Sequence, residues 1–568
     1  MGRHSGISRY RNSRVGRYQV QITGNPPVLF GDHASMIFPI RLTFAIFILV
    51  QLLPSATRTA RANDFPSQAL TPTVAGVGWT TVTLADLIKR SKSDCIVESV
   101  RLITCTGPLH LDALSKTSVL GGGVEIQFTN PQAGKGGFVL TGAENIVLSN
   151  FMIGWLGGGA RDPIVVGVDR IQSFGYVTAC ANHEPGGMLT LDLPLEGRQP
   201  LGSASVWSDT MGWPWYPAAP KTFEVYFPAG ATANFFEGKS GCIPRLAALV
   251  GHRALLRHIV SSNHAFLCWG CQNVTVRQVR VTSAPGMAFV FGNGGSNFSL
   301  IDDVVEPKCA PSCALPEPST TADASHFSNV AGNILLENND FGWQGDDGVN
   351  ITGLLVPATL DLRVPNAKRR LNVVEAWQGR LDSMAVGSSV SLFDAGLSAL
   401  GEAKVVAVNP ATGMIELSSL PADVTDFILA RTDGIPKNVV IRNNHFHSNR
   451  ARGILLGGSN ALIENNRIER VTMEGILVPA DTGPWYEGPG AQHVIITGNY
   501  FFNVNRFPAA VYPSAISTGV SMPAGYAAAI SVSPIQDVLV EGNSFTDVYT
   551  NANNPVSIGR GSSAAPIP

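Results

Sequence analysis

Short runs of β-branched and aromatic residues recur along the chain, and Gly or Asn turns separate them. Asn443-Asn444-His445-Phe446 and Asn465-Asn466-Arg467-Ile468 are two such runs. In both, a Gly-Ile-Leu triplet follows nine residues after the second Asn, and the two runs are 466 − 444 = 22 residues apart. A repeat of about twenty-two residues with short strands and no helical period predicts the stacked coils of a parallel β-helix.

The repeat extends over much of the chain and defines a column of asparagines. Related runs are Asn338-Asn339-Asp340-Phe341, Gly498-Asn499-Tyr500-Phe501 and Gly542-Asn543-Ser544-Phe545. Coils of a β-helix stack at about 4.8 Å, so equivalent side chains form ladders. We expect Asn339, Asn444, Asn466, Asn499 and Asn543 to stack at one turn, with their amides bonding neighbouring coils.

Two long segments break the repeat, and their short strands with Gly and Pro punctuation predict inserted β domains. The fold class is therefore all-β, a parallel β-helix with two inserted small β-barrels. The predicted organisation is an upstream segment and signal peptide (1–62), N-terminal coils (63–159), a first inserted barrel (160–250), coils with candidate acids (251–354), a second inserted barrel (355–435), C-terminal coils (436–554) and a flexible tail (555–568).

Composition supports a long buried core and argues against one class of partner. The 568 residues are 45% hydrophobic and 14% charged, with a formal net charge of −2. A nucleic-acid-binding surface needs clustered Lys and Arg. We therefore expect no nucleic-acid partner.

The segment from Met36 to Ala62 has the features of a secretory signal. Arg41 precedes an apolar run of about a dozen residues, and Ala60-Arg61-Ala62 is typical of a cleavage site before Asn63. The run is short for a membrane span. We expect a start at Met36, cleavage after Ala62, and a secreted or periplasmic protein without stable membrane insertion; an N-terminal membrane anchor is the alternative.

The chain has 8 cysteines, an even number that permits disulfides in a secreted protein. The close pairs Cys268/Cys271 and Cys309/Cys313 are predicted as local disulfides. No histidine stands at ligand spacing beside them. We therefore expect no metal and no cofactor.

Candidate chemistry centres on two adjacent carboxylates, Asp346 and Asp347, which lie between glycines. Like charges at neighbouring positions repel, so such a pair suggests a functional demand. Asp323 lies 347 − 323 = 24 residues earlier, one coil away. The same alignment stacks Arg452 on Asp347 and Glu474 on Arg452. We expect these residues to line one groove.

Carboxylates across a groove, with aromatics that sugars stack on, suggest glycoside hydrolysis. The aromatics are in the loop Pro484-Trp485-Tyr486-Glu487-Gly488. We assign Asp346 as general acid, and Asp347 and Asp323 as bases that hold the water. The positive charge of Arg452 should keep Asp347 ionised.

The motifs Thr321-Ala322-Asp323-Ala324-Ser325-His326-Phe327 and Gln344-Gly345-Asp346-Asp347-Gly348-Val349-Asn350, together with the two interruptions, resemble glycoside hydrolase family 110. The resemblance implies a right-handed β-helix of the pectin-lyase kind, and an exo-acting, inverting α-1,3-galactosidase. It implies three catalytic aspartates at 323, 346 and 347. The candidate substrate-binding residues are Arg452, Glu474, Trp485, Tyr486, Glu487, His326 and Asn350.

Three alternatives remain open. A polygalacturonase-like hydrolase also has an Asp, Asp-Asp site, but Arg450-Ala451-Arg452-Gly453 stands where its histidine motif is expected. A polysaccharide lyase would need a Lys or Arg base and acids that bind calcium. A non-catalytic carbohydrate-binding β-helix would have no need for three aspartates on one face.

Overall fold

A computed structural model describes residues 8–11, 72–155, 172–257, 263–558 and 562–564. Gaps fall at 92, 130–136, 184–185, 193–205, 209–222, 227–230, 236–252, 258–262, 309–318, 363–368, 423, 450, 472, 483–484, 506–513, 522–533, 551–553 and 559–561. The predicted signal segment and the Cys309/Cys313 pair lie outside the described residues. Among the residues described, no helix combines the length and apolar character that a membrane span requires.

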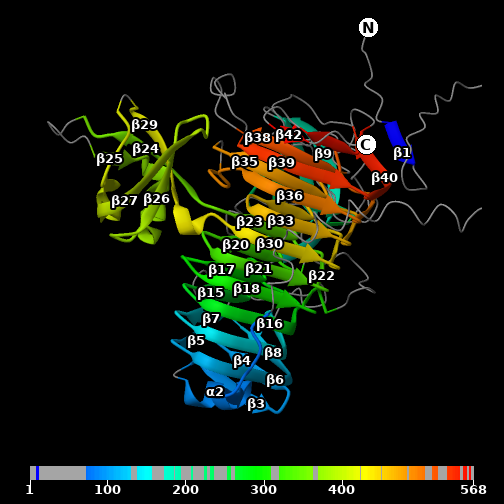
Figure 1. Ribbon diagram of the computed structural model, residues 1–568. Helices are drawn as coiled ribbons and strands as arrows, with labels where there is room; N and C mark the ends of the chain where they lie inside the picture. Colours follow the sequence, from blue (N-terminus) through cyan, green and yellow to red (C-terminus); the bar gives the residue numbers. More distant parts are fainter. Residues whose placement is uncertain are drawn as a thin grey trace, which may run out of the picture.

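The chain winds into a solenoid with one sheet of ten parallel strands along one face (Figure 1). In chain order the strands are β5 (Leu109–Asp112), β7 (Phe138–Thr141), β15 (Phe266–Trp269), β17 (Phe289–Gly292), β20 (Ser325–Ser328), β23 (Val349–Thr352), β32 (Ile454–Leu456), β35 (Ile476–Asp481), β38 (Ile516–Ser521) and β41 (Val556–Ile558). Each strand pairs with the next in this order, so every strand adds one coil.

A twenty-stranded sheet covers the other faces of the coils. Its strands are β1 (Ser8–Arg11), β2 (Thr80–Thr83), β3 (Cys95–Ser99), β4 (Leu102–Cys105), β6 (Ser115–Phe128), β8 (Glu144–Trp155), β16 (Gln272–Val281), β18 (Ser296–Ile301), β19 (Val304–Val305), β21 (Ala331–Glu337), β22 (Asp340–Gly342), β30 (Lys437–Arg442), β31 (His445–His447), β33 (Ser459–Glu464), β34 (Arg467–Glu469), β36 (Ala491–Thr497), β37 (Tyr500–Phe502), β39 (Ile535–Glu541), β40 (Ser544–Thr550) and β42 (Ser562–Ala564). The all-β solenoid predicted from the repeat is confirmed.

One short helix, α2 (Leu84–Arg90), closes the N-terminal end of the core (Figure 1). Thr83 caps it by accepting a hydrogen bond from the Asp86 backbone N–H, and Leu84 and Ile88 are buried. At the other end, β41 and β42 lie in the segment predicted as a flexible tail. There β41 pairs with β38 and β42 pairs with β39.

Buried phenylalanines stack up the middle of the solenoid. The rings of Phe291 and Phe327, on successive coils, are 4.7 Å apart and nearly parallel. Phe341 meets Phe446 edge-on at 6.0 Å. The second contact joins the coil before the second insertion to the coil after it.

The asparagine column is confirmed. Asn339 Nδ2 donates to Asn444 Oδ1 at 2.8 Å, and Asn444 Nδ2 donates to Asn466 Oδ1 at 2.9 Å. The pattern continues through Asn499 to Asn543 at 2.9 and 3.0 Å. Each amide therefore links one coil to the next inside the turn.

Glycine recurs at one position of the repeat for a steric reason. A Cβ on Gly348 would lie 2.5 Å from the Gly453 carbonyl oxygen, and one on Gly453 would lie 2.6 Å from the Gly475 oxygen. Backbones of successive coils approach too closely here for any side chain. The glycines thus set the register of the residues that precede them.

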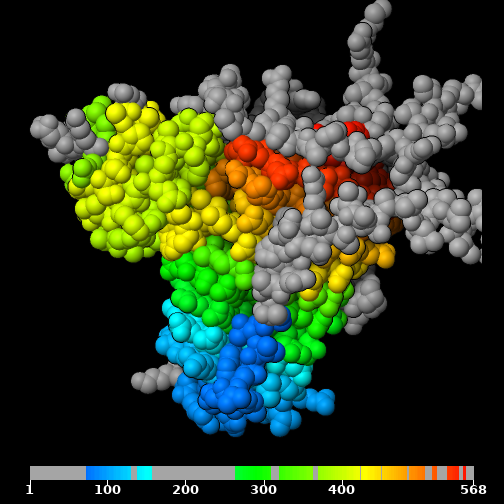
Figure 2. Space-filling model, in the orientation of Figure 1, coloured from blue at the N-terminus to red at the C-terminus, as the bar shows by residue number. Residues whose placement is uncertain are grey.

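The second interruption of the repeat is a closed barrel in the order β24-β25-β28-β27-β26-β29. Its elements are β24 (Leu355–Leu360), β25 (Arg370–Val373), η3 (Glu375–Ser383), β26 (Ser389–Phe393), β27 (Ala399–Asn409), η4 (Pro410–Thr412), β28 (Met414–Leu417), β29 (Asp426–Arg431) and η5 (Thr432–Gly434). Figure 2 shows the barrel, in yellow-green, standing beside the later coils. The barrel has a hydrophobic core of its own.

The first interruption forms a six-stranded antiparallel sheet in the order β11-β14-β9-β10-β13-β12. Its strands are β9 (Gln172–His183), β10 (Gly186–Asp192), β11 (Val206–Ser208), β12 (Phe223–Tyr226), β13 (Ala231–Phe235) and β14 (Arg253–Arg257). Closure of this sheet into a barrel stays a prediction.

The disulfide prediction for Cys268 and Cys271 was wrong, since both are buried thiols. Cys268 lies in β15 and faces the core, whereas Cys271 follows a left-handed turn at Gly270 and places Sγ 3.6 Å from the Leu140 carbonyl oxygen. A disulfide joins Cys95 to Cys105 across β3 and β4, a pair that the sequence did not single out.

Candidate active site

Four charged residues occupy the same position on successive coils. Asp323, Asp347, Arg452 and Glu474 each stand two residues before their strand begins, ahead of β20, β23, β32 and β35. Backbone bonds hold this register: Ala324 N donates to Asp347 O, Gly348 N to Arg452 O, and Gly453 N to Glu474 O. The predicted charge column is therefore present, and the strand pairing creates it.

The three aspartates converge. One carboxylate oxygen from each of Asp323, Asp346 and Asp347 lies within 4.8 Å of the others. The Asp347 backbone N–H donates to Asp323 Oδ1 at 3.1 Å. Asp323 and Asp347 are buried, while Asp346 is only partly buried. Asp346 is therefore the member of the trio most open to a bound molecule.

Arg452 ties the acids to the next coil. Its backbone N–H donates to Asp347 Oδ1 at 2.8 Å, and Nη1 lies 3.3 Å from both oxygens of that carboxylate. Its Nε lies 3.3 Å from Glu474 Oε2, and Glu474 is fully buried. One guanidinium thus bridges two buried carboxylates.

The protonation expected for Asp347 needs correction. Burial raises the pKa of Asp347 to about 8; Arg452 opposes the shift but does not cancel it, and Asp346 and Asp323 add to it. Burial likewise raises the pKa of Asp323. The guanidinium does not keep Asp347 ionised, because desolvation at this depth outweighs one cation. Asp347 therefore retains a proton at neutral pH.

His326, in β20, contacts Asp323, which lies three residues earlier in the chain. Its Nδ1 lies 2.8 Å from Asp323 Oδ2. Burial opposes protonation of the ring, but Asp323 outweighs burial and raises the pKa of His326. Sequence reasoning missed His264, whose pKa falls to about 4 through burial and the nearby His326. His264 precedes β15 on an earlier coil and lies outside the quoted motifs.

Asn350 faces outward from β23 beside this site. It pairs in register with His326 on one side and Leu455 on the other, while Val349 and Ile351 point into the core. Asn350 Oδ1 is buried and has no hydrogen-bond partner among the described residues. A buried acceptor without a partner is costly, so it is suited to a ligand hydroxyl.

The aromatic loop is anchored by the second barrel. Arg380 of η3 donates to the carbonyl oxygens of Tyr486 at 2.6 Å and Trp485 at 2.9 Å. The Tyr486 ring lies 5.3 Å from the Trp377 ring and packs on the solenoid core. Trp485 is 65% exposed. Trp485 therefore offers an open aromatic face, whereas Tyr486 is mostly engaged in packing.

Glu487 belongs to the same loop, and its negative charge contributes to the raised pKa of His326. The role of Arg380 and Trp377 was missed, because nothing in the sequence of the barrel indicates which of its residues meet the solenoid.

Hydrogen bonds from neighbouring coils hold the backbone of the loop that carries Asp346. Asn449 Nδ2 donates to the Asp346 carbonyl oxygen at 2.9 Å and to the Arg452 carbonyl oxygen at 2.6 Å. Gly345 N donates to Thr320 O at 2.9 Å. Both neighbouring coils therefore hold the backbone of the two adjacent aspartates.

Comparison with known proteins adds to this geometry. The family model described as "Right handed beta helix region" matches residues 427–564. The chain is 30% identical over 193 residues to alpha-1,3-galactosidase A of Shewanella woodyi, covering 33% of this chain and 31% of the relative. It is 24% identical over 306 residues to alpha-1,3-galactosidase B of Bacteroides thetaiotaomicron, covering 53% and 47%. The chain thus spans less than half the length of either relative.

Solved structures with a similar chain course include the periplasmic alginate epimerase AlgG, with a TM-score of 0.31 and 8% identity over 82% of this chain and 62% of that one. Another is the catalytic domain of a family 87 alpha-1,3-glucanase in complex with tetrasaccharides, with a TM-score of 0.37 and 10% identity over 84% and 57%. The match to the curated proteins confirms the resemblance found in the motifs. This chain is a β-helix protein homologous to the alpha-1,3-galactosidases.

Proposed function

We propose that the protein is a glycoside hydrolase that removes terminal α-1,3-linked galactose from glycans. The observation that carries the proposal is the convergence of Asp323, Asp346 and Asp347 within 4.8 Å, with Asp346 the least buried. The homology to proteins named alpha-1,3-galactosidase supports the choice of sugar and linkage.

In this mechanism Asp346 donates its proton to the glycosidic oxygen as the bond from that oxygen to C1 breaks. Water held by Asp323 and Asp347 attacks C1 and gives up a proton to a carboxylate. Burial raises the pKa of Asp347 to about 8, so this carboxyl carries a proton at neutral pH. Asp347 passes that proton to Asp346 as Asp346 protonates the leaving oxygen, and the ionised Asp347 then accepts a proton from the water. Asn350 Oδ1 accepts a hydrogen bond from a sugar hydroxyl. The Trp485 ring stacks on a face of the sugar.

The stereochemistry is a separate proposal. The resemblance implies inversion. The nearest carboxylate oxygens lie within 4.8 Å, closer than the roughly 6.5–9.5 Å between carboxyl groups of typical inverting pairs. Inversion therefore requires Asp323 and Asp347 to hold water on the face of the sugar opposite its aglycone. NMR of the galactose first released tests this: β-galactose supports inversion, and α-galactose contradicts it.

A panel of nitrophenyl glycosides and α-1,3-linked galactosyl oligosaccharides tests the function. We expect free galactose from the α-galactosides and none from β-galactosides. No galactose from any α-1,3-linked substrate would contradict the proposal. An unsaturated product that depends on calcium would instead favour a lyase, since the trio is also a set of oxygen ligands. Glycan binding without release would favour a non-catalytic β-helix.

We also propose that the protein acts outside the cytoplasm, after cleavage following Ala62. The Cys95–Cys105 disulfide supports an oxidising compartment. N-terminal sequencing of the mature protein should begin at Asn63. A mature chain that retains residues 36–62 would contradict cleavage.

A further inference from the structure

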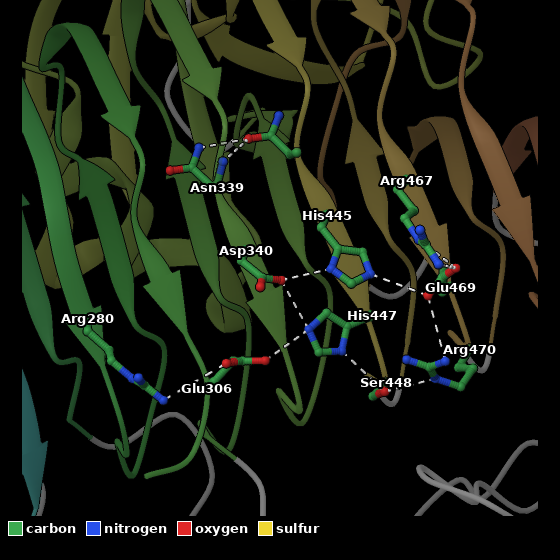
Figure 3. A network of polar contacts seen from close by, with 11 residues as sticks. Arg280, Glu306, Asn339, Asp340, His445, His447, Ser448, Arg467, Glu469 and Arg470 are labelled. Atoms are coloured by element: carbon green, nitrogen blue, oxygen red, sulfur yellow. Dashed lines mark hydrogen bonds and ion pairs between the residues drawn. The ribbon is translucent and has the colours of Figure 1, made fainter. Parts of the chain in front are cut away.

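A second cluster of ionisable side chains lies on the twenty-stranded sheet, outside the aspartate trio (Figure 3). Asp340 is in β22, and His445 and His447 are both in β31, the next strand of the sheet. Phe446 between them is buried in the core. The two imidazoles therefore face outward together, toward Asp340.

The donor atoms of these three residues converge. His445 Nδ1 lies 3.0 Å and His447 Nε2 lies 3.1 Å from Asp340 Oδ1. All three atoms are within 4.8 Å of one another. Asp340 Oδ1 is buried, yet it accepts no well-directed hydrogen bond among the described residues.

These spacings suit a metal ion. Zn²⁺ binds His nitrogen and carboxylate oxygen at about 2.0–2.1 Å, so ligand atoms around a tetrahedral ion lie about 3.3 Å apart. The two observed nitrogen–oxygen distances are within a few tenths of an ångström of that value. Glu306 Oε1 lies 3.2 Å from His447 Nε2 and can fill a fourth position.

The remaining ring nitrogens have partners of the kind that orient metal-bound histidines. His445 Nε2 lies 3.4 Å from Glu469 Oε2, and His447 Nδ1 lies 3.3 Å from Ser448 Oγ. Such partners fix the ring tautomer and orientation. A Cβ at Gly342 would overlap the His447 ring, so the glycine gives the imidazole its place.

We propose that Asp340, His445 and His447 bind one divalent transition-metal ion, with Zn²⁺ the expected species. Asp340 precedes the inserted barrel and the histidines follow it, so the ion joins the two ends of a 105-residue excursion (445 − 340). His447 is two residues before Asn449, which holds the Asp346 carbonyl oxygen. The ion therefore stabilises the coils that carry the proposed catalytic loop, and it takes no part in bond cleavage.

Metal binding to the full chain tests this directly. The protein, free of any affinity histidine tag, is stripped with chelator and titrated with Zn²⁺ against a chromophoric competitor. We expect one equivalent to bind and the melting temperature to rise, since the ion binds the folded state. Co²⁺ in its place should give the visible absorption of a four-coordinate ion.

Variants separate this site from adventitious binding. His447→Gln and Asp340→Asn should each weaken Zn²⁺ binding at least tenfold and abolish the rise in melting temperature. His493→Gln is the matched control, because His493 also contacts a carboxylate, Asp537, on the next coil at 2.6 Å; it should bind one equivalent. Asp340→Asn keeps the side-chain size and guards against a folding defect. The proposal would be overturned if the wild type bound no stoichiometric Zn²⁺, or if wild type and His447→Gln bound it equally. The cluster would then be an ion-pair network without a metal.

Discussion

Two columns of stacked side chains run along the same solenoid. They differ in how completely neighbouring groups satisfy their hydrogen bonds and charges. In the asparagine column, Asn444 donates to Leu336 O and Asn466 Oδ1, and accepts from the backbone and side chain of Asn339. In the charge column, Asp323 and Asp347 lie buried together, and burial raises the pKa of both. The first column stabilises the coils, whereas the second is an energetic cost that a functional site explains.

The largest expected effect is a loss of activity on changing the charge column. Asp347→Asn should lower kcat about 10³-fold, because the amide cannot accept a proton from the attacking water. The control is Asp433→Asn, which removes a carboxylate that also pairs with an arginine, Arg431, but is exposed on the barrel. Its kcat should match wild type. Steady-state kinetics on an α-1,3-linked galactoside measures kcat for both variants. Equal kcat for Asp347→Asn and wild type would show that Asp347 is not the base.

A change in the asparagine column should affect stability rather than activity. Asn444→Ala should lower the free energy of unfolding by about 3 kcal/mol, since it leaves buried donors and acceptors on both neighbouring coils without partners. Chemical denaturation measures this, with turnover per folded molecule close to wild type. A loss below about 1 kcal/mol would show that the column adds little to the fold.

The link between Arg452 and the aspartates predicts a pH effect. Asp347 retains its proton up to about pH 8, so activity should fall as pH rises through that value. Arg452 lowers the pKa of Asp347, and a lysine cannot bridge Asp347 and Glu474 equally well. Arg452→Lys should therefore raise this pKa and move the alkaline limb of kcat upward, by about half a unit to one unit.

The control for that shift is Arg442→Lys, since Arg442 pairs with Glu337 at 2.8 Å on the twenty-stranded sheet, away from the trio. Its pH profile should match wild type. An alkaline limb that stays in place in Arg452→Lys, or moves to lower pH, would contradict the electrostatic link.

The smallest expected effect concerns Trp485. Trp485→Ala should raise KM about fivefold with little change in kcat, because one stacking face contributes about 1 kcal/mol. Trp269→Ala removes another exposed indole, at the far end of a strand on an earlier coil, and should leave KM unchanged. Equal KM values for the two variants would exclude Trp485 from substrate binding.

The sequence predicted both columns because stacking in a solenoid follows directly from a repeat length. Asn444 and Asn466 are one period apart, and so are Arg452 and Glu474. Strand pairing then leaves no freedom in which side chains become neighbours.

Features that depend on depth or on contact between domains could not be predicted. The period places Arg452 beside Asp347, but it does not show that burial outweighs the guanidinium. Arg380 reaches the aromatic loop from a barrel whose orientation no local pattern specifies. The His445-Phe446-His447 triplet is a signal visible in the sequence, since alternate strand residues share a face and the two histidines therefore lie together.

The most direct test is turnover by Asp346→Asn on a terminal α-1,3-linked galactose. Asp346 is the partly exposed member of the trio, and the exchange removes its proton while keeping its size. We predict that kcat falls about 10³-fold with the fold intact, and that a substrate with a good leaving group regains part of the rate. Full turnover by this variant would contradict the assignment of the aspartate trio as the active site.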